Sequence, residues 1–228
     1  MGRERNAKKM KAECRIEDVV AALKAGERVL MMTRHAERPH IDPEDPTFGE
    51  NLPITDGGVV MARGVGERLR PAADMASVQF LASPLRRTRM TAAAIADGMG
   101  LASKWNIDTI PTDVLIGNSS PYYSDPHEAW EIFRGGEFYR LMFEYCETGR
   151  QRGFRPIDEA TDMVEALVMS RFTAQLGIFT THDLFIAAFL TSRRIYRGWT
   201  VPTWIQYLDS AAIFIAPDGS RRYALVRA

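Results

Sequence analysis

Short apolar runs that end in charged residues constrain this chain most, because they predict buried strands that deliver polar side chains to one edge of a sheet. The first run covers residues 29–33 (V-L-M-M-T), and Arg34 and His35 follow it directly. Its length and apolar character are typical of a buried strand. Open α/β sheets bind ligands at the carboxyl ends of their strands. Arg34, His35 and the nearby Arg38 are therefore predicted to face a ligand, and the planar fork of arginine suits a phosphate.

Two later segments repeat this arrangement. Residues 78–82 form an apolar run, and S-P-L-R-R-T-R-M-T-A (residues 83–92) follows as the start of a helix, whose N-terminus favours anions. Residues 176–181 form a third run, followed by His182, Asp183 and another helix. The alternative for the first segment is that its arginines are surface charges and its histidine an ordinary histidine at a strand end. Three agreeing segments favour a shared anion site instead.

The alternation of predicted strands and helices favours an α/β fold, here a three-layer α/β/α sandwich with a central, mostly parallel sheet. The predicted strands cover residues 29–33, 77–82, 104–110 and 176–181, with a hairpin formed by residues 211–216 and 223–226. The predicted helices cover residues 16–25, 56–70, 85–97, 157–173 and 184–191. We expect residues 1–228 to form a single domain, in which residues 117–155 are a helical insertion over the site and act as a partial lid.

At these motifs the chain resembles the histidine phosphatase superfamily, whose fold includes cofactor-dependent phosphoglycerate mutases and histidine acid phosphatases. R-H-A-E-R (residues 34–38) is similar to the R-H-G signature of the family. Residues 83–92 are similar to its S-x-L-x-R-[AT]-x-x-T-A segment, and T-H-D (residues 181–183) to the segment with its second histidine. Residues 52–58 (L-P-I-T-D-G-G) look like the L-T-x-x-G entry to its first long helix. The resemblance implies the same fold and a phosphate-transferring site.

The resemblance also implies a role for each motif residue. His35 would be the nucleophile that takes the phosphoryl group. The phosphate pocket would be completed by Arg34, Arg87 and His182, and from its position we expect Arg38 to bind the phosphate with them. Neither a metal ion nor an organic cofactor is required for this chemistry.

Some positions depart from the family pattern and leave the proton donor open. Ala36 stands where the family usually has glycine, and a positive φ there would cost about 1 kcal/mol. Glu37 resembles the R-H-G-E form of the mutase branch, in which a glutamate after the third strand usually supplies the proton, but residues 112–120 contain no glutamate. Asp183, directly after the second histidine, resembles the acid phosphatase branch. We assign the donor to Asp183, ahead of Glu37 and Glu137, although Asp183 also suits a helix N-cap.

The insertion offers candidates for recognition of the organic part of a substrate. Tyr122, Tyr123 and Arg134 lie in it, and Glu37 and Glu137 are further candidates. The alternative for the many aromatic residues of the insertion is that they pack against one another.

Composition excludes several other classes of protein. The 228 residues are 46% hydrophobic and 25% charged, with a formal net charge of zero, so no overall field attracts nucleic acid or a membrane. The histidines form no H-E-x-x-H pair, and we expect no metal site. Cys14 and Cys146 provide no disulfide framework, which favours a reducing, cytoplasmic environment. The charged N-terminus lacks the apolar segment of an export signal, and no apolar run is long enough to span a membrane.

The sequence therefore predicts a phosphomonoester hydrolase that acts on a small phosphorylated metabolite through a phosphohistidine intermediate. A protein phosphohistidine phosphatase in signalling is the first alternative, and a noncatalytic phosphate-binding regulator is the second. Mutase activity is less expected, because the glutamate after the third strand is missing. The sequence leaves the substrate and the oligomeric state open.

Overall fold

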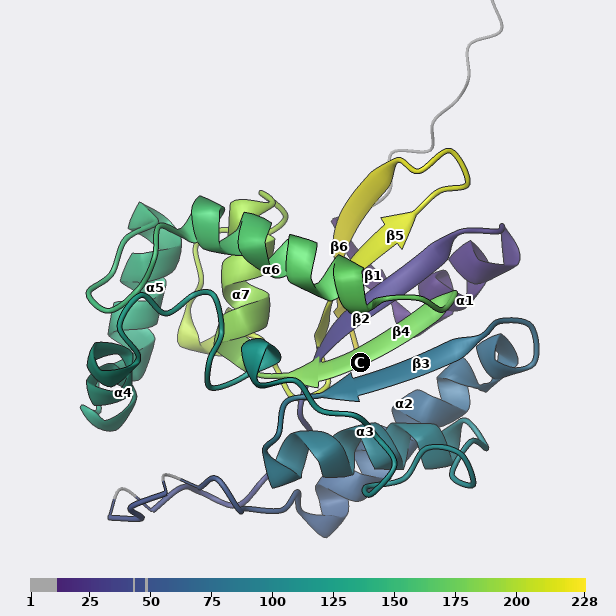
Figure 1. Cartoon of the computed structure of the whole chain (residues 1–228), viewed down its shortest axis with the longest axis horizontal. Coiled ribbons are helices and arrows are strands. Elements are labelled where there is room, and N and C mark those ends of the chain that lie inside the picture. Colours follow the sequence, from purple (N-terminus) through teal and green to yellow (C-terminus); the bar gives the residue numbers. More distant parts are fainter. Residues whose placement is uncertain (1–11, 43, 48) are drawn as a thin grey trace, which may run out of the picture.

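The computed structural model describes residues 12–42, 44–47 and 49–228 (Figure 1). Within them, six strands form one sheet in the order β1-β6-β5-β2-β4-β3. Only β5 runs against its neighbours, so the predicted, mostly parallel sheet is confirmed. The strands are β1 (Glu13–Arg15), β2 (Arg28–Arg34), β3 (Val78–Ala82), β4 (Leu176–Thr181), β5 (Ser210–Ile215) and β6 (Arg221–Arg227).

Helices cover both faces of this sheet, which confirms the three-layer α/β/α sandwich. Successive residues of a strand point to opposite faces, and β2 accordingly supplies Leu30 and Met32 to one core and Val29 and Met31 to the other. One face carries α1 (Ile16–Lys24), α2 (Asp56–Ala73) and α3 (Arg86–Gly98). The other carries α6 (Ile157–Arg171) and α7 (Asp183–Ser192), with α4 (Pro126–Arg134) and α5 (Phe138–Thr148) of the insertion beside them.

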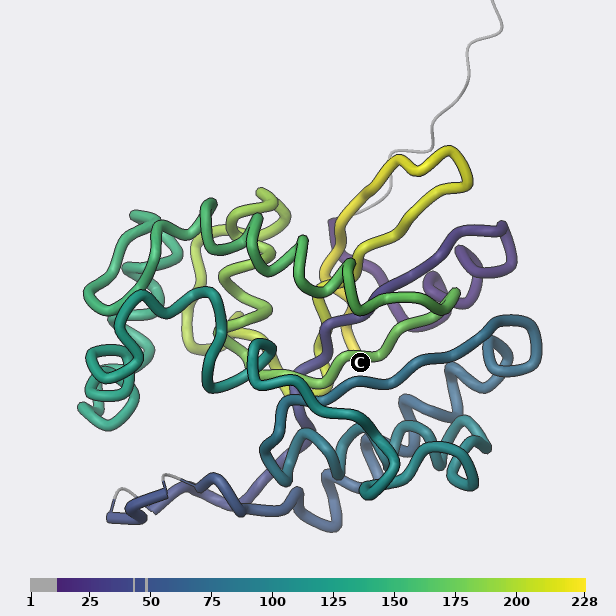
Figure 2. The backbone as a smooth tube through the Cα atoms, in the orientation of Figure 1, coloured from purple at the N-terminus to yellow at the C-terminus, as the bar shows by residue number. Residues whose placement is uncertain are grey.

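The insertion lies on the side of the molecule toward which β3 and β4 point (Figure 1). The tube of Figure 2 shows α4 and α5 packed together with α7 on that side, beyond the carboxyl ends of the strands. Helix α7 is almost entirely apolar, and every residue from Leu184 to Thr191 is buried. It is therefore a core helix between the sheet and the insertion.

The register of the central strands brings the predicted motifs to one place. Thr33 of β2 pairs with Thr180 of β4, and Ala82 of β3 pairs with the same residue. The ladder continues past the strand ends, since the His35 amide donates to the Thr181 carbonyl at 3.0 Å. Three strands therefore end level, and the residues that follow them meet at one edge.

One prediction of local structure was wrong, and one strand was missed. Residues 104–110 are a series of turns rather than a strand, because the Asn106 side chain accepts hydrogen bonds from the amides of Asp108 and Thr109 at 2.9 and 3.2 Å. Such local side-chain bonds compete with pairing to a neighbouring strand. The short edge strand β1 was not expected, since its three residues lack a readable alternation.

All five predicted helices form, with small shifts of their ends. The helix expected at residues 56–70 extends through Pro71 to Ala73, and the helix expected at residues 184–191 begins one residue earlier, at Asp183. Among the described residues, no helix has the length and apolarity that crossing a membrane requires.

Replacing Gly66 with alanine is expected to destabilise the fold by about 3 kcal/mol, because helices α2 and α3 touch at this glycine. A Cβ at Gly66 would lie 2.1 Å from the Ile95 carbonyl oxygen, and one at Gly98 would lie 2.1 Å from the Arg63 carbonyl oxygen. Overpacking of this kind forces the backbone to move. Urea unfolding measures the effect.

The matched control is Gly64→Ala in the same helix, where a Cβ would meet nothing within 4 Å. Alanine should stabilise the helix there by up to about 1 kcal/mol, because it is the better helix former. Equal effects of the two substitutions would contradict the close packing of α2 on α3.

Candidate active site

His35 lies directly after β2 with only 4% of its surface exposed. Its Nδ1 lies 2.8 Å from the carbonyl oxygen of Ala36, to which a ring nitrogen can only donate, so Nε2 keeps its lone pair. Burial, together with the nearby His182 and Arg87, holds the pKa of His35 well below 6.5. The imidazole is therefore neutral and has a nitrogen free to attack an electrophile. Ala36 has a negative φ, so alanine is unstrained there.

The second histidine faces the first. The rings of His35 and His182 are 5.6 Å apart between centroids, and His182 Nε2 lies 3.1 Å from the hydroxyl of Ser83. Ser83 in turn lies 3.0 Å from the Thr88 hydroxyl at the start of α3. Burial and then the Arg87 charge lower the pKa of His182 to about 3, so this ring is also neutral. Residues that follow β2, β3 and β4 thus form one hydrogen-bonded site.

Three arginines surround the histidines and have unused hydrogen-bond donors. The buried Nε atoms of Arg34, Arg38 and Arg87 lack partners, and they are three of the five such buried side-chain nitrogen or oxygen atoms found among the described residues. Burial, and then the neighbouring Arg38, lower the pKa of Arg87 to about 10, so it remains charged at neutral pH. A buried donor without a partner is costly. A bound anion would satisfy these donors.

Asp183, the first residue of α7, contacts the same cluster. Its Oδ2 lies 3.1 Å from an Arg34 guanidinium nitrogen and accepts a hydrogen bond from Trp204 Nε1 at 3.1 Å, while Oδ1 accepts from the Leu184 amide at 2.9 Å. Burial alone would raise the pKa of Asp183, but the Arg34 charge and these hydrogen bonds outweigh it and lower the pKa below 3.8. The carboxylate is therefore ionised here. Its contacts extend beyond those of a helix cap.

Two aromatic residues at the site were missed from the sequence. The Tyr207 ring lies 5.8 Å from the His35 ring and 4.4 Å from the Arg34 guanidinium carbon. Trp204 is buried and fixes Asp183. Both precede β5, and no motif marks them. The adjacent Leu208 has a positive φ of 68°, which costs a bulky residue about 1–2 kcal/mol and is typical of functional segments.

A family model described as histidine phosphatase superfamily (branch 1) matches residues 30–109, the part of the chain that carries His35 and Arg87. The similarity to the histidine phosphatase superfamily therefore covers residues 30–109, about a third of the chain. No curated protein sequence matches it.

Solved structures agree with the histidine phosphatase fold. Mycobacterial hydrolase 2 has 16% identity and a TM-score of 0.51, with 87% of this chain and 89% of that chain covered. Mycobacterial hydrolase 1 has 17% identity and a TM-score of 0.50, with coverage of 87% and 96%. Bacillus stearothermophilus YhfR has 16% identity and a TM-score of 0.50, with coverage of 86% and 95%. At these identities the likeness is one of fold.

In residues 112–120, where the mutase branch has its glutamate, no carboxylate reaches His182. Asp113 points away and pairs with Arg171 at 3.0 Å. Gly117 is the residue of this segment beside the site, since a Cβ there would lie 2.8 Å from Ser83 Cβ and 3.8 Å from His182 Nε2. No side chain fits at that point. A carboxylate close to His182 must therefore come from another segment of the chain.

The two tyrosines of the insertion have different surroundings. Tyr122 is 1% exposed, its hydroxyl lies 3.1 Å from that of Thr161, and its ring packs on Phe185. Because it is sealed in the core, the prediction that Tyr122 contacts substrate was wrong. Tyr123 is partly buried against Phe154, and burial and then the Asp183 charge raise its pKa. Tyr123 is not sealed in the core as Tyr122 is, so it remains a candidate.

The remaining candidates serve mainly as structural contacts. Glu37 is exposed and accepts a hydrogen bond from the Thr55 hydroxyl at 2.8 Å, where it supports the start of α2. Glu137 is exposed and pairs with Arg140 at 2.9 Å. The geometry thus ties both glutamates to other partners, and Asp183 is the carboxylate that contacts the arginine cluster.

Contacts also join the proline-rich loop of residues 39–53 to the site and to the insertion. Arg87 donates to the Gly49 carbonyl at 2.8 Å. Arg134 donates to the carbonyls of Asp45 and Pro46 at 3.1 and 2.9 Å. This loop therefore lies between the phosphate-binding arginines and the insertion. Among the described residues, no group of three or more histidines, cysteines and carboxylates has the arrangement of a metal site.

Acid should destabilise this fold below about pH 6.5, because His35 and His182 are held neutral. Each has a folded-state pKa below the ordinary 6.5, so the unfolded chain binds more protons as the pH falls from 6.5 toward the folded-state values. The stability loss is up to about 1.4 kcal/mol per pH unit for each histidine. Urea unfolding at pH 7 and pH 5 measures it.

His35→Asn is the control for this pH dependence. It removes one of the two groups and should flatten the decline between pH 6.5 and pH 5. An unchanged slope would show that His35 is not held neutral in the folded protein.

Proposed function

We propose that this protein hydrolyses phosphomonoesters of small metabolites through a phosphohistidine at His35. The observation that carries the proposal is the set of three buried guanidinium Nε donors without partners around a neutral imidazole. Neutral histidine is a nucleophile, and preorganised cations stabilise the charge that shifts to the phosphoryl oxygens during transfer. A phosphate fits these groups, because its oxygens accept hydrogen bonds from guanidinium donors.

In the first step, His35 Nε2 attacks phosphorus as the bond to the ester oxygen breaks. Arg34, Arg38, Arg87 and His182 hold the other phosphoryl oxygens, and Asp183 gives a proton to the departing oxygen. In the second step, water attacks phosphorus, its proton passes to Asp183, and the phosphorus–nitrogen bond breaks to release inorganic phosphate. His35 returns to its neutral state.

Asp183 can act as an acid only after a phosphate has bound. In the free site, Arg34 and Trp204 keep the carboxylate ionised. A dianionic phosphate offsets the arginine charges, which raises the pKa of a neighbouring carboxyl group. Binding of the substrate phosphate thus favours the protonated form of Asp183, which can then donate its proton.

A small substrate is favoured over a protein because residues 117–155 and the 39–53 loop are joined beside the site. The hydrogen bonds of Arg134 and Arg87 to this loop make the connection. We propose that the insertion is a partial lid and that Tyr123 contacts the organic part of the substrate. Because Cys14 and Cys146 are both free, we also propose a cytoplasmic protein.

The direct test is phosphate release from a panel of sugar, nucleotide and acyl phosphates beside a phosphohistidine peptide. Turnover of small esters well above that of the peptide supports the proposal. Faster turnover of the peptide favours the phosphohistidine phosphatase, and tight phosphate binding without turnover favours the noncatalytic regulator.

Replacing Asp183 with asparagine should slow alkyl phosphates by about a hundredfold, because their alkoxides need a proton to leave. The same variant should be much less impaired on p-nitrophenyl phosphate, whose phenolate leaves unaided. Steady-state kcat values for the two substrates measure the difference.

Glu137→Gln is the matched control, since Glu137 is an exposed carboxylate paired with Arg140. It should leave both rates unchanged. If Asp183→Asn slows both substrates equally while Glu137→Gln shows the leaving-group dependence, the assignment of Asp183 as the donor is wrong.

A further inference from the structure

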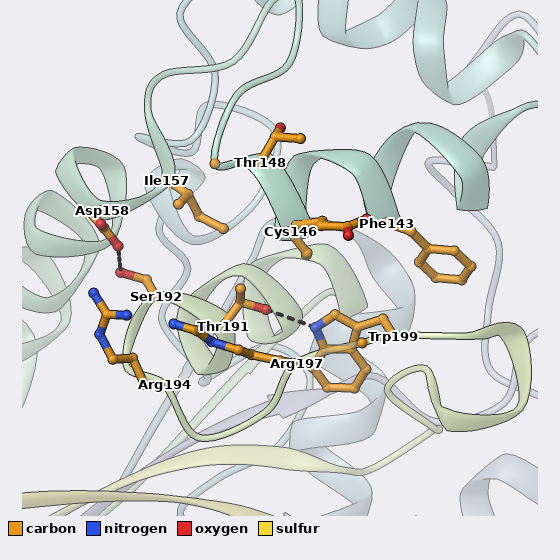
Figure 3. A pocket seen from close by; sticks show the side chains of 13 residues that line it. Phe143, Cys146, Thr148, Ile157, Asp158, Thr191, Ser192, Arg194, Arg197 and Trp199 are labelled. Carbon is orange, nitrogen blue, oxygen red and sulfur yellow. Dashed lines mark hydrogen bonds between the residues drawn. The ribbon is translucent and has the colours of Figure 1, made fainter.

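A second cavity, of about 450 Å³, lies where α5 ends, α6 begins and α7 ends (Figure 3). It is lined by Phe143 and Glu147 from α5, Asp158 from α6, and, from the segment after α7, Arg194, Arg197, Gly198 and Trp199. None of the residues that line it belongs to the His35 site. Its volume lies within the range of about 300–1,000 Å³ that is typical of small-molecule sites.

Two arginines at the open side of this cavity are exposed to solvent and have no protein partner among the described residues. Among residues 12–42, 44–47 and 49–228, no group forms a hydrogen bond or an ion pair with the guanidinium of Arg194 or Arg197. The adjacent Arg193 differs, because it pairs with Asp162 and Glu165 at 2.8 and 2.7 Å. Both unpaired guanidinium groups reach the cavity from the segment after α7 (Figure 3).

The backbone at Arg194 is a second, independent observation. Arg194 has a φ of 59° at the position after the C-cap of α7, and its amide donates to the Thr191 carbonyl at 3.0 Å. Helices that end in this way usually place glycine there, because other residues are strained. The chain has arginine at a position that favours glycine, and its side chain lines the cavity.

The rest of the lining combines opposite charge with an apolar wall. Glu147 and Asp158 supply two carboxylates, and Asp158 accepts a hydrogen bond from the Ser192 hydroxyl at 2.6 Å. Phe143 and Trp199 supply aromatic surface, and the Trp199 indole is held by a 2.8 Å hydrogen bond to Thr191 (Figure 3). The charged side chains of the lining are two cations and two carboxylates, so a multiply charged phosphate would meet repulsion as well as attraction.

We propose that this cavity binds a small zwitterion of the amino-acid class. Arg194 and Arg197 bind its carboxylate, since a guanidinium pairs well with a carboxylate. Glu147 and Asp158 accept hydrogen bonds from its ammonium group. Its apolar side chain packs against the aromatic wall.

The experiment screens the twenty standard L-amino acids against the full chain by thermal shift and titration calorimetry. The best ligand is then compared with the analogue that lacks its ammonium group, the analogue that lacks its carboxylate, and inorganic phosphate. The amino acid should bind at least tenfold more tightly than either one-charge analogue. Failure of every amino acid to bind, or equal binding of the analogues, would overturn the proposal.

Variants assign the binding to this cavity. Arg194→Gly removes the guanidinium but suits the positive φ, so it should weaken amino-acid binding at least tenfold while the melting temperature stays the same or rises. Arg197→Gln should weaken binding similarly. Arg152→Gln, an exposed arginine outside the cavity lining, is the control and should bind as the wild type does.

Phosphate release measured without amino acid should be unchanged in these variants, because their side chains lie outside the His35 site. Unaltered amino-acid binding in both Arg194→Gly and Arg197→Gln would show that the ligand binds elsewhere. This readout is independent of phosphatase activity, so failure of either proposal leaves the other standing.

Discussion

Replacing His35 with alanine should lower kcat for phosphomonoesters by at least about a thousandfold, because the substitution removes the nucleophile and with it the covalent route. Rapid quenching of the wild type with labelled substrate should trap a protein-bound phosphoryl group that is labile in acid and stable in alkali. The variant should trap none. His35 is the group that the structure prepares for this role, being buried, neutral and oriented by its Nδ1 hydrogen bond.

The control for this experiment is His40→Ala, in which an exposed histidine of the 39–53 loop is removed. That variant should keep both its turnover and its labelled intermediate. Wild-type turnover in His35→Ala would rule out the phosphohistidine mechanism.

Replacing Arg87 with alanine should lower kcat/KM by about two to three orders of magnitude. Arg87 is buried and fully charged at neutral pH, and its Nε has no partner until an anion binds. Loss of one preorganised donor to the transferring group typically has an effect of this size. Steady-state kinetics with p-nitrophenyl phosphate measures it, because that leaving group does not depend on the proton donor.

Arg86→Ala is the matched control, since it removes the neighbouring arginine, which is exposed at the start of the same helix. Its kinetics should stay near those of the wild type. Equal losses in the two variants would mean that α3 presents its arginines to the site in a different register.

The central part of the fold was predictable because its signals are local. The apolar runs of β2, β3 and β4 are each long enough to be recognised as strands. The polar and charged residues that follow each run mark where the strand ends. The strand predicted at residues 104–110 did not form, because a local side-chain interaction opposes it. Asn106 uses its side chain to stabilise turns there, and sequence alone does not show whether such turns or pairing with a neighbouring strand will prevail.

The site was predictable only where a motif ends a strand. The histidines, Arg34, Arg87 and Asp183 were found in this way, and the structure brings them together. Tyr122 was misjudged because its burial depends on how the insertion packs against α6 and α7, which a sequence does not reveal.

The antiparallel direction of β5 explains why Trp204 and Tyr207 were not predicted from the sequence. It also divides the site residues into two groups with different origins. Parallel strands deliver residues to the site as they leave the sheet, whereas an antiparallel strand delivers the residues that precede it. The parallel strands supply the histidines and arginines that we propose to bind phosphate. The residues just before β5 supply aromatic side chains that contact Asp183 and Arg34. Substitutions in the segment of Trp204 and Tyr207 should therefore alter the preference for leaving groups without removing the residues proposed to bind phosphate. Laboratory evolution toward new substrates can begin at this segment.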